Sequence, residues 1–161
     1  MADYSARYKT LRHIETVRNY LQAVVCVLFG RAIAHDQCKL ESPEAEVFDV
    51  VTHKLRGMTY GSDEYKTCLS ERDPALVHHY AASRHHPEHY KGGIQDMNLV
   101  DLVEMLCDWK AATMRHADGD IYKSIEMNQK RYGYSDETKA FLNNTAVLLD
   151  SLDVVHKANE S

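Results

Sequence analysis

The chain has 161 residues, a length that fits one domain with a buried core. Hydrophobic residues make up 44% and charged residues 27%, as in a soluble globular protein, and the formal net charge is −5. Proteins that bind extended duplex nucleic acid through its phosphates are usually basic, so we expect no such partner. A small anionic substrate is not excluded, because a bound metal ion or local cations can receive it.

The N-terminal sequence MADYSARYKT lacks the apolar core of a signal peptide, and we expect no segment long enough to span a bilayer. The protein is therefore predicted to be cytoplasmic and to have no membrane contact, with homo-oligomerisation left open. Its four cysteines are widely spaced and form no CxxC pair. This pattern predicts reduced, mostly buried thiols rather than a disulfide framework.

Apolar residues recur at helical spacing from Leu11 to Leu28 and predict a helix over about 8–29. Gly30 is predicted to interrupt it, and a short helix over 31–35 to follow. Ser42-Pro43-Glu44 is a helix start, with serine as N-cap and proline in the first turn, and predicts a helix to about Arg56.

The rest of the chain is also predicted to be helical. Pro87 disfavours helix at the residue before it, and Asn98 is predicted to cap a long helix. Val, Ile and Thr never alternate at period two for long, so no strand is predicted. The fold class is all-α, a single compact domain over 1–161. The further helices are expected at about 61–71, 73–85, 98–116, 121–131 and 136–156.

The adjacent pair His35-Asp36 is the central chemical signal, because an imidazole nitrogen and a carboxylate oxygen at a helix end can bind one ion. Divalent metals of borderline hardness accept such mixed nitrogen and oxygen donors. His13 lies on the preceding predicted helix and Asp108 on a later one. Taken singly, each of these residues is more often an ordinary core or surface group. The ordered set of four predicts one metal site.

This ordered set resembles the HD-domain superfamily of metal-dependent phosphohydrolases, in the segments LRHIETV, IAHDQCKL and EMLCDWKAA. The chain also resembles an uncharacterised HD-like family of phages and bacteria, in YGSDEYK, HHPEHY, MNLVDLVEMLCDW and GDIYKSIEMN. The resemblance implies an HD-like helical bundle with His13, His35, Asp36 and Asp108 as metal ligands.

Five histidines crowd the segment from His78 to His89. His79 and His86 are seven residues apart, a spacing that places them on one face if the helix continues. Solvated histidines at a helix end are the alternative. The segment HHPEHYKGG resembles the double-histidine segment that supplies the second metal in binuclear HD proteins. We therefore select three of the five as second-metal ligands: His79, His85 and His86.

Several other residues are candidates for supporting roles. Glu104 is one turn before Asp108 and is predicted to orient a ligand or a water, with a surface salt bridge as the alternative. Lys39 resembles the lysine that binuclear HD proteins and related oxygenases carry after the His-Asp pair, where HD nucleotidases carry glutamate. The catalytic set is Asp36, Lys39 and Glu104. The substrate-binding set is Lys39, Arg115, Tyr60 and Lys66.

The resemblance implies a phosphohydrolase that acts on a nucleotide or another small phosphate ester. Its cofactor would be one or two divalent ions of Mn, Mg, Co, Ni or Fe, and its partner the small phosphate substrate. Two alternatives remain open: an HD-type di-iron oxygenase, and a metal-stabilised binding or regulatory protein without turnover.

Overall fold

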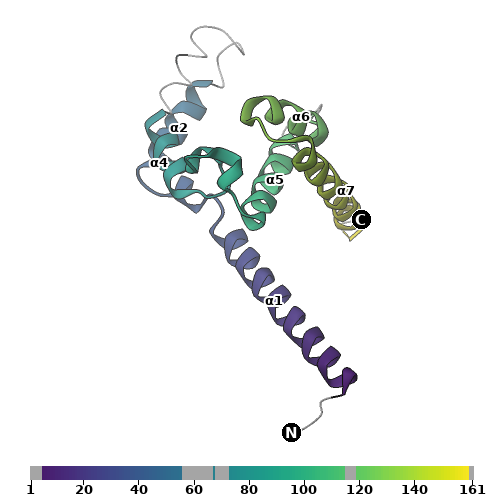
Figure 1. The fold of residues 1–161 in the computed structure, drawn as a ribbon. Coiled ribbons are helices and arrows are strands. Elements are labelled where there is room, and N and C mark those ends of the chain that lie inside the picture. The colour runs from purple at the N-terminus through teal and green to yellow at the C-terminus, as the bar shows by residue number, and fades with distance from the viewer. Residues whose placement is uncertain (1–4, 56–66, 68–72, 115–118, 160–161) are drawn as a thin grey trace. The chain divides into compact units, whose positions relative to one another are not determined.

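The computed structural model describes residues 5–55, 67, 73–114 and 119–159 (Figure 1). The protein is all-α, as predicted, and no strand occurs among these residues. The chain falls into two compact units, residues 1–35 and 36–161, which are described separately below. The assignment of the whole chain to a single domain stays a prediction.

The first unit is one long helix, α1 (Ala6–Ala34). The Ser5 side chain accepts a hydrogen bond from the Tyr8 backbone N–H at 3.4 Å and caps the helix. The predicted interruption at Gly30 is wrong, because the helix continues through this glycine to its C-cap, His35. A helical glycine costs only about 1 kcal/mol, and the apolar, helix-compatible residues on both sides outweigh that cost.

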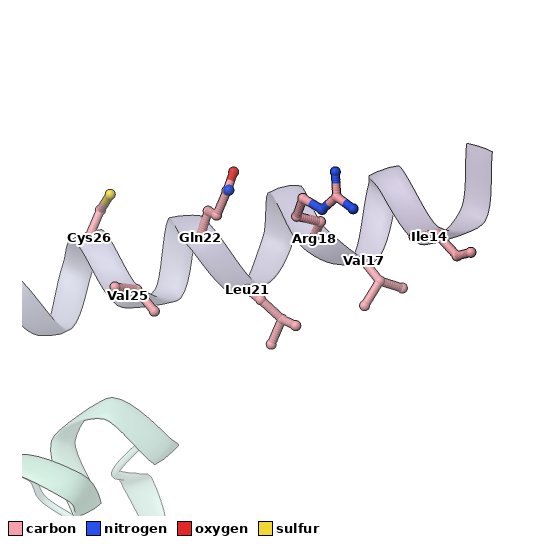
Figure 2. Close-up of a pocket in the computed structure, with 7 residues that line it drawn as sticks. All are labelled: Ile14, Val17, Arg18, Leu21, Gln22, Val25 and Cys26. Atoms are coloured by element: carbon pink, nitrogen blue, oxygen red, sulfur yellow. The ribbon is translucent and has the colours of Figure 1, made fainter. Parts of the chain in front are cut away.

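One side of α1 carries an apolar stripe formed by Ile14, Val17, Leu21 and Val25, which line a shallow surface hollow (Figure 2). Because α1 does not break, the segment Ala6–Leu40 is long and apolar enough to cross a membrane by length and composition, contrary to expectation. This is weak evidence, since core helices and signal sequences pass the same test. The cytoplasmic location stays a prediction.

The second unit begins with the ligand-bearing segments. The 3₁₀ turn η1 (Gln37–Leu40) leads into α2 (Glu44–Leu55), and α2 packs against both η1 and α4 (Asp73–Ala82). Two further 3₁₀ turns follow α4, namely η2 (Pro87–His89) and η3 (Gly93–Asp96). These elements place residues 36–44 next to the C-terminal end of α4.

Three further helices complete the second unit: α5 (Leu99–Thr113), α6 (Ile121–Tyr132) and α7 (Asp136–Asn159). They pack on one another (Figure 1). Asn98 caps α5, as predicted, and Asp101 completes a capping box. The ring of Trp109 on α5 stacks on Tyr132 with centroids 6.3 Å apart. Their shared core contains Ile94, Met97, Met105, Leu106, Ile121, Ile125, Tyr134, Leu142 and Ala146.

Two predictions differ from the structure in this unit. The helix expected over 73–85 ends at Ala82, because His86, held in an extended conformation before Pro87, leaves no room for another helical turn. The three cysteines among the described residues are unpaired as expected, but Cys26 and Cys107 are exposed and Cys38 is half-buried. The prediction of buried thiols is therefore wrong for these three. The helix expected over 61–71 lies almost wholly outside the described residues.

Candidate metal centre

Asp36 opens the second unit in the left-handed conformation, with φ 55° and ψ 12°. Aspartate tolerates this conformation better than most residues, because its short side chain can hydrogen-bond locally. Its Oδ2 accepts a hydrogen bond from Lys39 Nζ at 2.6 Å, while its Oδ1 faces the histidines of α4 and of the turn after it. The backbone of one residue thus sets the direction of the carboxylate.

Two histidine nitrogens lie close to this carboxylate oxygen, and a third histidine lies next to one of them. Asp36 Oδ1 lies 3.3 Å from His79 Nε2 and 3.5 Å from His85 Nε2. His79 Nε2 lies 2.9 Å from His86 Nε2. One donor atom from each of these four residues lies within 4.8 Å of the other three, and His79 and His85 are buried. We call Asp36, His79, His85 and His86 the metal centre.

The donor spacing suits a divalent cation. Nitrogen and oxygen ligands about 2.1 Å from a metal are roughly 3.0 Å apart at right angles and roughly 3.4 Å apart at tetrahedral angles. Of the three separations, 3.3 Å falls in this range, and 2.9 and 3.5 Å each lie 0.1 Å beyond one of its ends. Three imidazoles and one carboxylate are also a donor set that borderline divalent metals accept. The residues of the metal centre could therefore hold a metal ion.

A buried glutamate holds the far side of His79. Glu44, at the start of α2, is fully buried, and its Oε2 accepts a hydrogen bond from His79 Nδ1 at 3.1 Å. Burial alone would raise the pKa of Glu44, but hydrogen bonds from His78, Cys38 and His79 outweigh it and lower that pKa. Because the carboxylate accepts the hydrogen bond from the protonated Nδ1, the Nε2 lone pair of His79 faces the metal centre.

A second carboxylate holds His85 in the same way. Glu104 on α5 is buried, and its Oε1 lies 3.1 Å from His85 Nδ1. The exposed salt bridge considered as the alternative for Glu104 is therefore not what the structure shows. Asp108 follows one turn later, half-buried, with a carboxylate oxygen within 4.8 Å of one from Asp36. Two carboxylates of α5, Glu104 and Asp108, thus border the metal centre.

The environment favours the neutral form of the His79 and His86 rings. Burial, together with the neighbouring His85, His79 and Lys39, lowers the pKa of His86 to about 3. Burial is also the largest cause of the lowered pKa of His79. Neutral imidazole is the form that binds metals. These rings can therefore bind an ion at neutral pH without first losing a proton.

The structure thus gathers three of the five clustered histidines, the same three that the sequence analysis selects. The other two make different contacts: His78 Nδ1 donates to Glu44 Oε1 at 2.7 Å, and His89 Nδ1 donates to the Tyr80 carbonyl at 2.9 Å. The spacing argument for His79 and His86 does not hold, because α4 ends between them. The chain reverses after Ala82 and brings the two rings together instead.

The histidines of the first unit are not brought together. His13 and His35 lie on the same unbroken helix, 22 residues apart, which places them about 33 Å apart along its axis. One ion cannot bind both within a single copy of this helix. Their assignment as ligands rests on the ordered set of four residues and on the HD resemblance, and it stays a prediction for each of them. Tyr60, Lys66 and Arg115, predicted to bind substrate, lie outside the described residues.

The sequence analysis misses Glu44, Cys38 and Ser83. The Sγ of Cys38 lies 3.2 Å from His79 Nδ1, and Ser83 Oγ lies 3.3 Å from the same nitrogen. Burial raises the pKa of the Cys38 thiol. Neither Cys38 nor Glu44 belongs to a local motif, since they precede His79 by 41 and 35 residues.

Comparison with known proteins gives a family without an assigned activity. The model of a family of unknown function, DUF5662, matches residues 2–150. No curated protein matches the chain, and no solved structure does.

Proposed function

The chain belongs to the DUF5662 family, and since that family has no assigned function, we propose from the metal centre that the protein is a metal-dependent phosphohydrolase of the HD type. Its substrate would be a nucleotide or another small phosphate ester. The observation that carries the proposal is the convergence of His79, His85 and His86 on Asp36, with a buried carboxylate behind two of the rings.

The residues of the metal centre have separate roles in this proposal. Asp36, His79, His85 and His86 would hold a divalent cation, and Asp108 borders the Asp36 carboxylate as a donor for a second one. When bound, such a cation neutralises charge on phosphoryl oxygens and lowers the pKa of water. Glu44 and Glu104 fix the orientation of two rings, so Glu104 is a positioning residue rather than a member of the catalytic set.

Lys39 is the proposed substrate cation. Its ammonium is half-buried, one turn of η1 beyond Asp36, and is held 2.6 Å from Asp36 Oδ2. A phosphoryl oxygen that enters beside Asp36 would share this ammonium and gain a charge-assisted hydrogen bond. In this way an acidic protein can bind an anionic substrate at one point.

A second candidate function is supported by the donor set. Three nitrogen donors and one carboxylate also suit iron, so an HD-type di-iron oxygenase is the alternative. It would require O₂ and reduced iron, whereas the hydrolase would release phosphate anaerobically with a metal such as Mg²⁺ or Mn²⁺. A metal-stabilised binding protein would turn over in neither assay.

The test is a panel of nucleotides and phosphate esters, assayed anaerobically for phosphate release with Mg²⁺, Mn²⁺, Co²⁺ or Ni²⁺. We expect at least one ester to be hydrolysed. His79→Ala should abolish the activity, and the matched control His53→Ala, at an exposed histidine of α2, should retain it. Oxygen uptake by the iron form, with no phosphate release from any ester, would replace the proposal by the oxygenase.

A further inference from the structure

We propose a second cation site on the opposite side of the His79 ring, formed by Cys38 Sγ, Glu44 Oε2 and His79 Nδ1, for a thiophilic divalent ion such as zinc or cadmium. Sγ lies 3.2 Å and Oε2 3.1 Å from Nδ1, and all three donor atoms lie within 4.8 Å of one another. We call these three residues the thiol site.

The distances at the thiol site are those between zinc ligands. A sulfur about 2.3 Å and a nitrogen about 2.0 Å from zinc are roughly 3.1–3.6 Å apart, depending on the angle. Thiolate, imidazole and carboxylate together select softer ions than the all-nitrogen-and-oxygen metal centre does. Glu44 and His79 are buried, and the buried Ser83 hydroxyl lies 3.8 Å from Sγ. The site is thus largely shielded from water.

Binding at the thiol site has a defined proton balance. The S–H bond of Cys38 breaks, its proton leaves to solvent, and a sulfur–metal bond forms, because a coordinating thiol is deprotonated by the cation. The Nδ1 proton of His79, held by Glu44, must also leave. A neutral imidazole has one protonated nitrogen, so this proton moves to Nε2 when Nδ1 binds metal.

The two sites therefore exclude each other at His79. With Nε2 protonated, His79 cannot donate its lone pair to the metal centre, and the centre loses one of its three imidazoles. A thiophilic ion at Cys38 would thereby weaken the binding of a harder ion such as manganese. The thiol site would thus let a thiophilic ion control the binding of a harder ion at the metal centre. This inference does not depend on which reaction the metal centre carries out.

Cobalt titration of the metal-free full-length chain tests the site, because cobalt–thiolate bonds give a charge-transfer absorption that nitrogen and oxygen ligands lack. We expect this absorption in the parent protein and in the triple variant Cys26→Ser/Cys68→Ser/Cys107→Ser, which keeps Cys38 as its one cysteine. Cys38→Ser and Cys38→Ala should lose it while keeping the helical circular dichroism of the parent. Its persistence in folded Cys38 variants would overturn the proposal, and so would its absence at saturating cobalt from both the parent and His86→Ala, in which the weakened metal centre competes less for His79.

Mutual exclusion has its own measurement. Zinc is added to manganese-loaded protein, and released manganese is followed by electron paramagnetic resonance. The zinc concentration that releases half of the manganese should rise at least tenfold in Cys38→Ser. An unchanged midpoint would refute the exclusion. Neither experiment requires turnover, so a failed search for phosphohydrolase activity leaves both readouts intact.

Discussion

At the scale of single residues, Asp36 combines a backbone constraint with a chemical role. Its positive φ orients the carboxylate, whose two oxygens face different partners, Lys39 on one side and the histidines on the other. Asparagine tolerates the same backbone conformation, whereas a residue such as alanine does not do so without strain. The two roles can therefore be separated by substitution.

We predict that Asp36→Asn folds normally but binds divalent metal at least about a hundredfold more weakly, a loss of about 2.7 kcal/mol. Asp36→Ala should show the same loss and, in addition, a free energy of unfolding lowered by about 1 kcal/mol. Isothermal titration with Mn²⁺ and urea unfolding measure the two effects. Parent-like metal affinity in Asp36→Asn would remove Asp36 from the metal centre.

The carboxylate behind His85 gives a second prediction. Glu104→Gln keeps the size of the side chain but removes the charge next to His85 Nδ1, 3.1 Å away. Loss of such an outer partner typically lowers metal affinity about 10–100-fold. The control Glu126→Gln, on α6, should bind metal like the parent. Equal affinities in the two variants would show that Glu104 does not position His85.

The sequence pattern identifies the histidines of this site better than it identifies the residues that hold those histidines in place. Crowding of histidines in a short segment draws attention to His79, His85 and His86 even though the helix that was to align them ends early. Glu44 and Cys38 reach the site only because α2 packs on α4, a tertiary contact with no local sequence pattern. A buried carboxylate can be distant in sequence from the ring that it holds. Such a carboxylate is recognised only once the fold is known.

At the scale of elements, the start of α5 is fixed by one buried carboxylate. Asp101 accepts hydrogen bonds from Arg84, from the Tyr90 hydroxyl at 2.7 Å and from the Asn98 backbone at 3.1 Å. Burial alone would raise the pKa of Asp101, but these partners outweigh it and lower that pKa. The start of α5 is thereby anchored to η2, so Glu104 is placed one turn further along.

Asp101→Asn should lower the free energy of unfolding by about 2 kcal/mol at pH 7, because a charged acceptor with several donors is lost. A carboxylate whose pKa is lowered by folding stabilises the protein above its ordinary pKa, and this stabilisation disappears as the pH falls through the lowered value. The difference between parent and variant should therefore shrink in acid. Urea unfolding at several pH values checks this, with exposed Asp49→Asn as control; a difference independent of pH would contradict it.

Two glycines, one inside α1 and one that caps the end of α6, should respond to substitution in opposite directions. A Cβ at Gly30 would meet nothing within 4 Å, so Gly30→Ala should stabilise α1 by about 0.5–1 kcal/mol. Gly133, the C-cap of α6 with φ 67°, is equally open. Gly133→Ala should nevertheless destabilise by about 1 kcal/mol, because the backbone is left-handed there. Denaturant unfolding followed by far-ultraviolet circular dichroism measures both, and a destabilising Gly30→Ala would indicate a helix interrupted at that position.

Element boundaries show where sequence signals are strong. Asn98 with Asp101 forms the predicted cap, since capping depends on residues close in sequence. The break predicted at Gly30 does not occur, because the free-energy cost of one helical glycine is smaller than the stabilisation from the helical residues around it. The end of α4 differs from the expected one because His86 is extended before Pro87, which leaves no room for a further helical turn over the three preceding residues.

At the scale of the whole molecule, charge is divided unequally between the two units. Residues 1–35 carry five basic and two acidic side chains, whereas residues 36–161 carry fourteen and twenty-two. The net negative second unit, which contains the metal centre, attracts cations and favours their binding over the binding of free anions. A phosphate ester must therefore rely on the bound cation and on Lys39.

Removal of metal should destabilise the molecule. A ligand present at about 100 times its dissociation constant adds roughly 2.7 kcal/mol to the stability of the folded state. For a chain of this size such a change corresponds to a Tm difference of several degrees. We expect a chelator to lower the Tm and added Mn²⁺ to restore it. In the His79→Ala variant the chelator should have no effect; a parent Tm that does not respond to chelator would argue against a resident ion.

The fluorescence of Trp109, which stacks on Tyr132, can report on the second unit. Trp109 is the single tryptophan of the chain and follows Asp108 directly on α5. Red-edge excitation therefore records fluorescence from the second unit alone, while the circular dichroism of the same sample includes α1. Unfolding of the two units can be followed separately in one cuvette. A paramagnetic ion bound beside Asp108 would dim this emission without any label attached to the protein.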